Sequence, residues 1–483
     1  MKRAEGHALK TDDADASAAH SATGDASLDD ALAYAARYAR DRRAKSQPLD
    51  AVEDAEALRR RFKMPLPEKG CGGADAIEAL IAAAEPGLVA NTSPQFFAWV
   101  MGASDATGVA ADWLTAAWGQ NAAIYQTSPA AAIAEEAVGD WLLELLDLPR
   151  GGSVGFVTGA TMAGFVGLAA ARTEVLARAG HDFEADGLQG APAIRVFLSE
   201  DAHVSNFGAL RFLGLGEANF VRVACDDQGL METRALRAAL ERVDGPKIII
   251  GQAGHINSGG FEDFEALANY ADAHNAWLHV DGAFGLWARV LPEKAELTAG
   301  VELADSWSVD GHKWLQLPYD SGFIVVRNAA AHRRAMTLSA GYLSQDPRDG
   351  RNPTEFNPEL SRRARGFAAW AVLRAHGRAG IVEMVRRHCA AAEALAARLS
   401  LVSGVETCNE VRLNQVAARV LRSDEATSDV AAALNREGRH FVRTALWRGR
   451  VVLRFSVISR DTDDAAVAQL ADDLARLVRT RSE

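Results

Sequence analysis

The sequence predicts an α/β protein built on a mostly parallel sheet that is flanked by helices. From Gly151 onward, short β-branched runs alternate with helical stretches, which is typical of strands joined by crossover helices. Several of these runs are apolar throughout, as expected for strands that are covered on both faces. With 483 residues, of which 48% are hydrophobic, the chain can bury a large core and form more than one domain.

The region before the sheet is expected to be a tail followed by helices. Residues 1–27 contain acids and histidines where a signal peptide needs an apolar core, and we expect a disordered tail. Residues 28–150 are expected to be mainly helical. Within them, 28–62 is amphipathic with an interruption near Pro48, and Pro149 marks the end of the last helix.

Residues 151–375 are expected to form the large α/β domain. The expected strands are 154–158, 194–199, 220–224, 247–252, 276–281 and 322–327. The stretch 304–322, ADSWSVDGHKWLQLPYDSG, also indicates a half-buried strand and turn. Residues 376–483 are first helical and then contain β-rich runs separated by a helix, which predicts a small α+β domain.

Charge and cysteine content exclude several classes of protein. The net charge of −12 leaves no basic excess to neutralise phosphates, which argues against a nucleic-acid or anionic-membrane partner. The four cysteines are scattered, show no CxxC spacing and are too few for a disulfide framework. We therefore expect a cytoplasmic enzyme, and no metal site is predicted.

Two candidate ligand contacts lie where strands end, because parallel sheets bind ligands beyond the carboxyl ends of their strands. The first strand runs into TGATMAGFVGLAAAR, where the exposed N–H groups of Gly159, Ala160 and Thr161 could hold a phosphate. Asp281 ends another strand. Each feature alone is also explained without a ligand, as an ordinary helix start or a turn-forming aspartate.

Two further candidates are a histidine and a lysine. His203 follows a strand and could stack on a planar ring, although a hydrogen-bonded loop histidine is the simpler interpretation. Lys313 lies between His312 and Trp314, where it is either a desolvated, nucleophilic amine of the kind that forms Schiff bases or a surface side chain resting on Trp314.

The order of these features points to one cofactor. A phosphate cradle, a ring-stacking candidate, an acid at a strand end and a lysine 32 residues after that acid follow one another along the chain. Pyridoxal 5'-phosphate requires these four contacts, for its phosphate, ring face, pyridine nitrogen and aldehyde.

The chain resembles the group II pyridoxal-phosphate-dependent amino-acid decarboxylases, which include the aromatic L-amino-acid, histidine and glutamate decarboxylases. The resemblance spans about residues 30–470. It rests on SPQFFAW (93–99), SPAAAIAEEAVGDWLLELLDLP (128–149), DAHVSN (201–206), WLHVDGAFG (277–285), ADSWSVDGHKW (304–314), GYL (341–343) and LSRRARGFAAW (360–370). It implies fold type I with a seven-stranded sheet.

The resemblance also implies a role for individual residues. Lys313 would bond covalently to the cofactor aldehyde, and Asp281 would pair with the pyridine nitrogen. His203 would stack on one ring face and Ala283 on the other. The phosphate would lie near Ala160, Thr161, Asp310 and His312. Tyr342, 29 residues after Lys313, would protonate the substrate carbon after carbon dioxide leaves, although a packing tyrosine is the alternative.

The chain departs from the family pattern at several positions. Met162, Ala163 and Gly164 stand where the family has an acidic or polar residue followed by Ala-Asn, which leaves the phosphate contacts uncertain by one position. Gly282 stands where alanine is commoner. In place of a G-T-T-like stretch the chain has His255, Ile256 and Asn257, and the sequence does not decide which of them contacts the cofactor.

The substrate is expected to be an aromatic or apolar L-amino acid. Residues 91–149 contain no Lys, Arg or His that would bind a second carboxylate, and Trp99, Asn121, Ala123 and Tyr125 instead suggest an apolar pocket, unless they only pack. Arg454, from VVLRFSVIS near the C-terminus, could still bring a cation to the pocket, although an arginine in a strand usually has a structural partner. The resemblance also implies a homodimer with its active site at the interface.

The alternatives to a decarboxylase are a transaminase, an aldehyde-forming lyase and a non-catalytic homologue.

Overall fold

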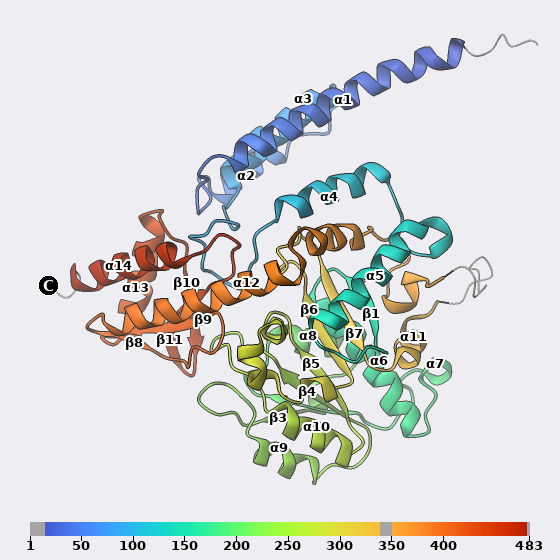
Figure 1. The fold of residues 1–483 in the computed structure, drawn as a ribbon, viewed down its shortest axis with the longest axis vertical. Coiled ribbons are helices and arrows are strands. Elements are labelled where there is room, and N and C mark those ends of the chain that lie inside the picture. The colour runs from blue at the N-terminus through green and yellow to red at the C-terminus, as the bar shows by residue number, and fades with distance from the viewer. Residues whose placement is uncertain (1–14, 339–349, 481–483) are drawn as a thin grey trace, which may run out of the picture. The chain divides into compact units, whose positions relative to one another are not determined.

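The computed structural model describes residues 15–338 and 350–480 and divides into two compact units, Met1–Ala90 and Asn91–Glu483. The described part of the first unit contains the helices α1 (Asp15–Arg43), α2 (Ala55–Phe62) and α3 (Gly73–Ala84), drawn in blue in Figure 1. Because α1 begins at Asp15, it includes residues 15–27, where the sequence predicts disorder. This stretch is rich in alanine, the strongest helix former.

The second unit is built on the predicted seven-stranded sheet. Its strands are β1 (Ser153–Val157), β2 (Arg195–Ser199), β3 (Phe220–Val223), β4 (Lys247–Gln252), β5 (Trp277–Asp281), β6 (Ser306–Asp310) and β7 (Gly322–Val326). They lie in the order β1-β7-β6-β5-β4-β2-β3. β7 runs antiparallel to β1 and β6, whereas the other neighbouring strands pair in parallel. This confirms the mostly parallel sheet. The predicted half-buried strand at 304–322 is β6, which is buried along its whole length.

Helices cover both faces of this sheet (Figure 1). The helices that follow its strands are α6 (Ala160–Arg178), α7 (Phe183–Asp186), α8 (Val204–Phe212), α9 (Thr233–Leu240), α10 (Phe264–Ala273) and α11 (Ala329–Met336). Alternate residues of β4 show the two layers. Ile248 and Ile250 pack into one apolar cluster with α6 and α8, whereas Ile249 packs into another with α10. A strand that buries both faces in this way must be apolar throughout, as the sequence indicates.

Helices α4 (Ala106–Trp118) and α5 (Pro129–Leu145) belong to the second unit, because they pack against α12 (Gly366–Ser400). The predicted helical segment 28–150 is therefore divided after Ala90. Helix α12 crosses the predicted domain boundary after residue 375. Its backbone is non-helical at Gly377, where φ is 58°, a conformation that glycine adopts without steric cost.

The C-terminal part is the predicted small α+β domain. Its antiparallel sheet has the order β10-β11-β9-β8, and α13, α14 and the end of α12 pack on it around a separate apolar cluster. The elements are β8 (Val405–Thr407), β9 (Gln415–Val420), α13 (Asp424–Arg436), β10 (Arg443–Trp447), β11 (Arg450–Ser456) and α14 (Asp464–Thr480). Among the helices of the described residues, none is both long and apolar enough to cross a membrane.

Candidate active site

A cavity of about 540 Å³ opens at the carboxyl edge of the large sheet. It gathers all of the described residues to which the resemblance assigns a role at the cofactor. They are Ala160, Thr161, His203, Asp281, Ala283, Asp310, His312 and Lys313. Tyr342 lies outside the described residues, so its role stays a prediction. The residues converge because the parallel strands β2, β4, β5 and β6 all end at this edge.

Lys313 points into this cavity. Its Nζ lies 2.8 Å from Oδ2 of Asp310 and 5.8 Å from the centroid of the Phe284 ring, and its side chain is only 18% exposed. Trp314 is completely buried and donates its indole N–H to Nδ1 of His388 at 2.9 Å. The amine is therefore held inside the site, and the alternative of a surface lysine resting on Trp314 does not describe this structure.

Asp281 is fixed at the end of β5 by two donors. Asn206 donates a side-chain N–H to Oδ2 at 2.9 Å, and the backbone N–H of Ala283 donates to Oδ1 at 3.3 Å. The carboxylate is buried but lines the cavity. The glycine at position 282, where alanine is commoner in the family, has a steric explanation, because a Cβ there would lie 2.7 Å from Cβ of Leu286.

A buried histidine supports β5 beneath the site. His279 lies two residues before Asp281 and therefore on the same face of the strand. Its Nδ1 lies 2.8 Å from the Ser306 hydroxyl, which also accepts the Trp277 indole N–H at 2.9 Å. Burial lowers the pKa of His279 to about 4, so the imidazole is neutral near pH 7.

His203 begins α8 and is held in one orientation. Its backbone N–H donates to Oε1 of Gln252 at 3.0 Å, and its Nδ1 accepts the backbone N–H of Ser205 at 3.3 Å. Nδ1 is thus the acceptor, and the ring proton sits on Nε2. Burial lowers the pKa of His203, which favours a neutral ring, and the residue lines the cavity.

The N-terminus of α6 forms the other end of the cavity. Gly159 precedes the helix, and a Cβ on it would lie 2.9 Å from Cε1 of His312 and 3.1 Å from Oδ1 of Asp310. Ala160 donates its backbone N–H to Oδ1 of Asp310 at 2.5 Å. Of the three residues that depart from the family pattern in this helix, Met162 lines the cavity, whereas Ala163 and Gly164 are buried.

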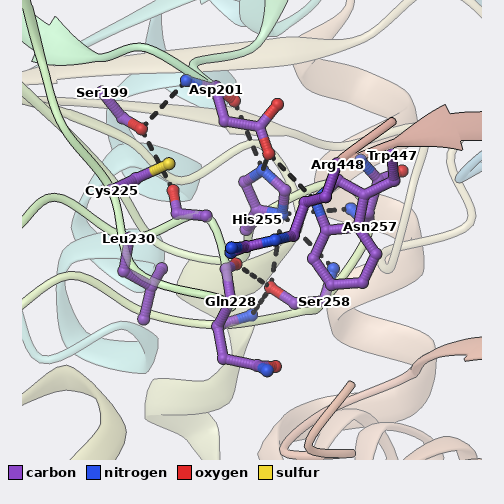
Figure 2. Close-up of polar contacts among 12 residues, drawn as sticks. Ser199, Asp201, Cys225, Gln228, Leu230, His255, Asn257, Ser258, Trp447 and Arg448 are labelled. Carbon is purple, nitrogen blue, oxygen red and sulfur yellow. Dashed lines mark hydrogen bonds and ion pairs between the residues drawn. The ribbon is translucent and has the colours of Figure 1, made fainter. Parts of the chain in front are cut away.

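The loop after β4 carries His255, Ile256 and Asn257, and one of these three residues faces the cavity. Ile256 lines it, whereas His255 and Asn257 are buried elsewhere. Figure 2 shows His255 between Asp201 and Ser258: Nε2 lies 3.1 Å from Oδ2 of Asp201, and Nδ1 lies 3.3 Å from the Ser258 hydroxyl.

The same aspartate ties this loop to the C-terminal domain. Trp447, at the end of β10, donates its indole N–H to Oδ2 of Asp201 at 3.0 Å (Figure 2). Its ring centroid lies 6.1 Å from that of His255. The imidazole of His255 therefore connects loops of the two domains. With His255 held in this way, the neighbouring Ile256 is the side chain that lines the cavity.

The outer wall of the cavity is apolar. Trp99, Val100 and Met101 line it. Trp99 has a φ of 55°, unusual for a bulky residue, and its ring lies about 6 Å from those of Phe96 and Phe441, which stack on each other at 4.8 Å. The other residues suggested for the pocket, Asn121, Ala123 and Tyr125, do not line this cavity. Ala123 is buried, Tyr125 is half-buried and Asn121 is exposed.

Arg454 reaches the cavity from β11 in the C-terminal domain. Among the described residues its guanidinium has no hydrogen-bond or ion-pair partner, and burial lowers its pKa. A partly buried cation without a partner is costly, which marks Arg454 as a candidate for binding an anion.

Three lining or supporting residues escaped the sequence interpretation. Gln252 ends β4 opposite Asp281, and its buried Nε2 has no partner within the described part of the chain. Asn206 is part of the motif DAHVSN, but the sequence did not indicate its hydrogen bond to Asp281. Tyr319 lines the cavity with its ring 4.4 Å from that of His312, and burial raises its pKa to about 12. The position of Gln252 at a strand end was the one signal that could have identified it.

Comparison with known proteins agrees with this site. The family described as "Pyridoxal-dependent decarboxylase conserved domain" matches residues 58–421. Tryptophan decarboxylase 1 of Oryza sativa subsp. japonica is 30% identical over 406 residues, which cover 77% of this chain and 78% of that protein. The aromatic-L-amino-acid decarboxylase of Bacillus atrophaeus is 26% identical over 441 residues, covering 88% and 90%.

A solved structure supports the fold. The crystal structure of Oryza sativa TDC with PLP and tryptamine superposes with a TM-score of 0.87 at 23% identity, covering 99% of this chain and 100% of that one. The match over residues 58–421 and the relative at 30% identity confirm the resemblance found in the sequence. The chain therefore belongs to the pyridoxal-dependent decarboxylase family.

Proposed function

We propose that this amino-acid decarboxylase removes the α-carboxylate of an aromatic or apolar L-amino acid as carbon dioxide and releases the corresponding amine. The observation that carries the proposal is the shared cavity, into which the Lys313 amine, the Asp281 carboxylate and the N-terminus of α6 all open. When bound, pyridoxal phosphate supplies the sink for the electrons that carbon dioxide leaves behind.

The residues present fit this cofactor. The cavity offers an amine for the aldehyde, a fixed carboxylate for the ring nitrogen and backbone N–H groups for the phosphate. Gln252 adds a buried N–H group that has no partner among the described residues, which is a further donor for a bound group. We assign the covalent contact to Lys313 and the ring-nitrogen contact to Asp281.

The remaining roles follow from position. Asn206 and the backbone N–H of Ala283 would keep Asp281 oriented so that it holds a proton at the ring nitrogen. We assign His203 and Ala283 to the two ring faces. The phosphate contacts are assigned to Ala160, Thr161 and His312, with Asp310 beside them. Delivery of a proton to the substrate carbon is assigned to Tyr342.

Arg454 is proposed to bind the substrate through the α-carboxylate. Every amino acid carries an α-carboxylate, and we assign this group to Arg454, whose guanidinium lines the cavity without a partner in the described chain. Trp99, Val100 and Met101 then form the wall for the side chain. Because this wall is apolar and residues 91–149 supply no Lys, Arg or His, an aromatic or apolar side chain suits it best.

We also propose that the protein is a cytoplasmic homodimer. Large apolar side chains of α4 and α12 are exposed in the single chain: Trp113 by 47%, Leu114 by 50%, Trp118 by 52% and Trp370 by 42%. The exposure of these large apolar groups favours a protein partner. Light scattering of the purified protein should give twice the monomer mass, and a stable monomer would contradict the dimer.

The reaction is tested with a panel of L-amino acids and all the products that the alternatives predict. We expect carbon dioxide and an amine in equal amounts, with the fastest turnover for an aromatic or apolar substrate. Keto-acid as the sole product would identify a transaminase, and aldehyde would identify the aldehyde-forming alternative. Preference for glutamate or aspartate would contradict the proposed substrate class.

Arg454→Met tests the substrate contact. Loss of a charge-assisted hydrogen bond should raise KM by roughly 10- to 100-fold. The amine product lacks the α-carboxylate and serves as the control, so its inhibition constant should stay within about twofold of the wild-type value. If the variant weakens the amine as much as the substrate, Arg454 does not bind the α-carboxylate.

A further inference from the structure

The carboxylate of Asp310 lies at the anion-binding end of α6. Its Oδ1 accepts the backbone N–H of Ala160 at 2.5 Å and lies 3.4 Å from Nε2 of His312, and its Oδ2 lies 2.8 Å from Nζ of Lys313. The side chain is 4% exposed. One N–H group of the helix N-terminus is therefore already bonded to an anion that belongs to the chain itself.

The backbone of Asp310 is fixed on both sides. Its N–H donates to the carbonyl of Ala283 at 2.9 Å, and its carbonyl accepts the Trp287 indole N–H at 3.3 Å. The side chain is also confined, because Gly159 passes so close that a Cβ there would lie 3.1 Å from Oδ1. The carboxylate therefore cannot move far when another anion approaches Ala160.

Two anions that share one donor oppose each other. A phosphate at the start of α6 would meet the negative charge of Asp310, and charge repulsion at a side chain this buried is less screened than at the surface. The cations that face Asp310 are Lys313 and, when protonated, His312, while the Tyr319 phenol is neutral and His203 is kept neutral by burial.

We propose that Asp310 lowers the affinity of this enzyme for the phosphate of its cofactor, because it competes for the N–H of Ala160 while it holds the Lys313 amine in place. The inference rests on the proposed phosphate position at the start of α6. It makes Asp310 a positioning residue for Lys313 at the expense of cofactor retention.

Asp310→Asn separates the two effects. The amide has nearly the same shape, and it can turn so that its oxygen faces Lys313 while its NH₂ group and the N–H of Ala160 both donate to the phosphate. The variant thus removes the negative charge without opening a cavity. Asp320→Asn is the matched control, since it removes a carboxylate of the same segment whose partner is Arg365, at 2.7 Å.

The experiment measures the affinity of the purified protein for pyridoxamine 5'-phosphate and for pyridoxamine by calorimetry. Neither probe has an aldehyde, so neither bonds covalently to Lys313. The ratio of the two affinities isolates the phosphate. We expect Asp310→Asn to raise this ratio on the order of tenfold, and Asp320→Asn to leave it within about twofold.

An unchanged or lower ratio in Asp310→Asn would overturn the inference and leave the proposed function intact. Failure of the wild-type protein to bind either probe would overturn the cofactor site and, with it, the inference. Circular dichroism checks that the variant is folded. If Asp310→Asn does not fold, Asp310→Ser removes the same charge, and the same rise in the ratio is required of it.

Discussion

Two buried carboxylates at the ends of adjacent strands determine how this site is built. Asp281 ends β5 and Asp310 ends β6, and the two strands are parallel neighbours in the sheet. A buried carboxylate requires hydrogen-bond donors or a cation. Asn206 and the N–H of Ala283 supply them for Asp281, whereas Lys313 and the N–H of Ala160 supply them for Asp310. The position of each of these residues follows from that requirement.

A third carboxylate, that of Asp201, holds the loops around the site together. His255 and Trp447 both contact Asp201, so the loop after β4 and the C-terminal hairpin are fixed against the loop that carries His203. β11, the second strand of that hairpin, brings Arg454 to the cavity. The small domain therefore supplies part of the lining of the cavity in the large domain.

The sequence predicted the core of the site because that core follows local rules. Asp281 ends a strand, His203 follows another, and Ala160 opens a helix after a third, so the parallel sheet alone brings them to one edge. Arg454 was only one possibility, since its arrival depends on how the two domains pack. Asn121, Ala123 and Tyr125 could not be separated from structural residues, because the sequence does not show whether a side chain faces a pocket or another part of the chain. Likewise, the sequence around Asp310 does not indicate that its carboxylate accepts a hydrogen bond from the backbone N–H of Ala160.

The covalent contact between Lys313 and the cofactor is the central claim, and one measurement tests it directly. The protein is incubated with pyridoxal phosphate and treated with borohydride, which makes the bond between a lysine and the cofactor aldehyde permanent, and its peptides are then weighed by mass spectrometry. The cofactor mass is predicted on the peptide that contains Lys313. Label on another lysine in its place, or protein that takes up no cofactor, would contradict the account.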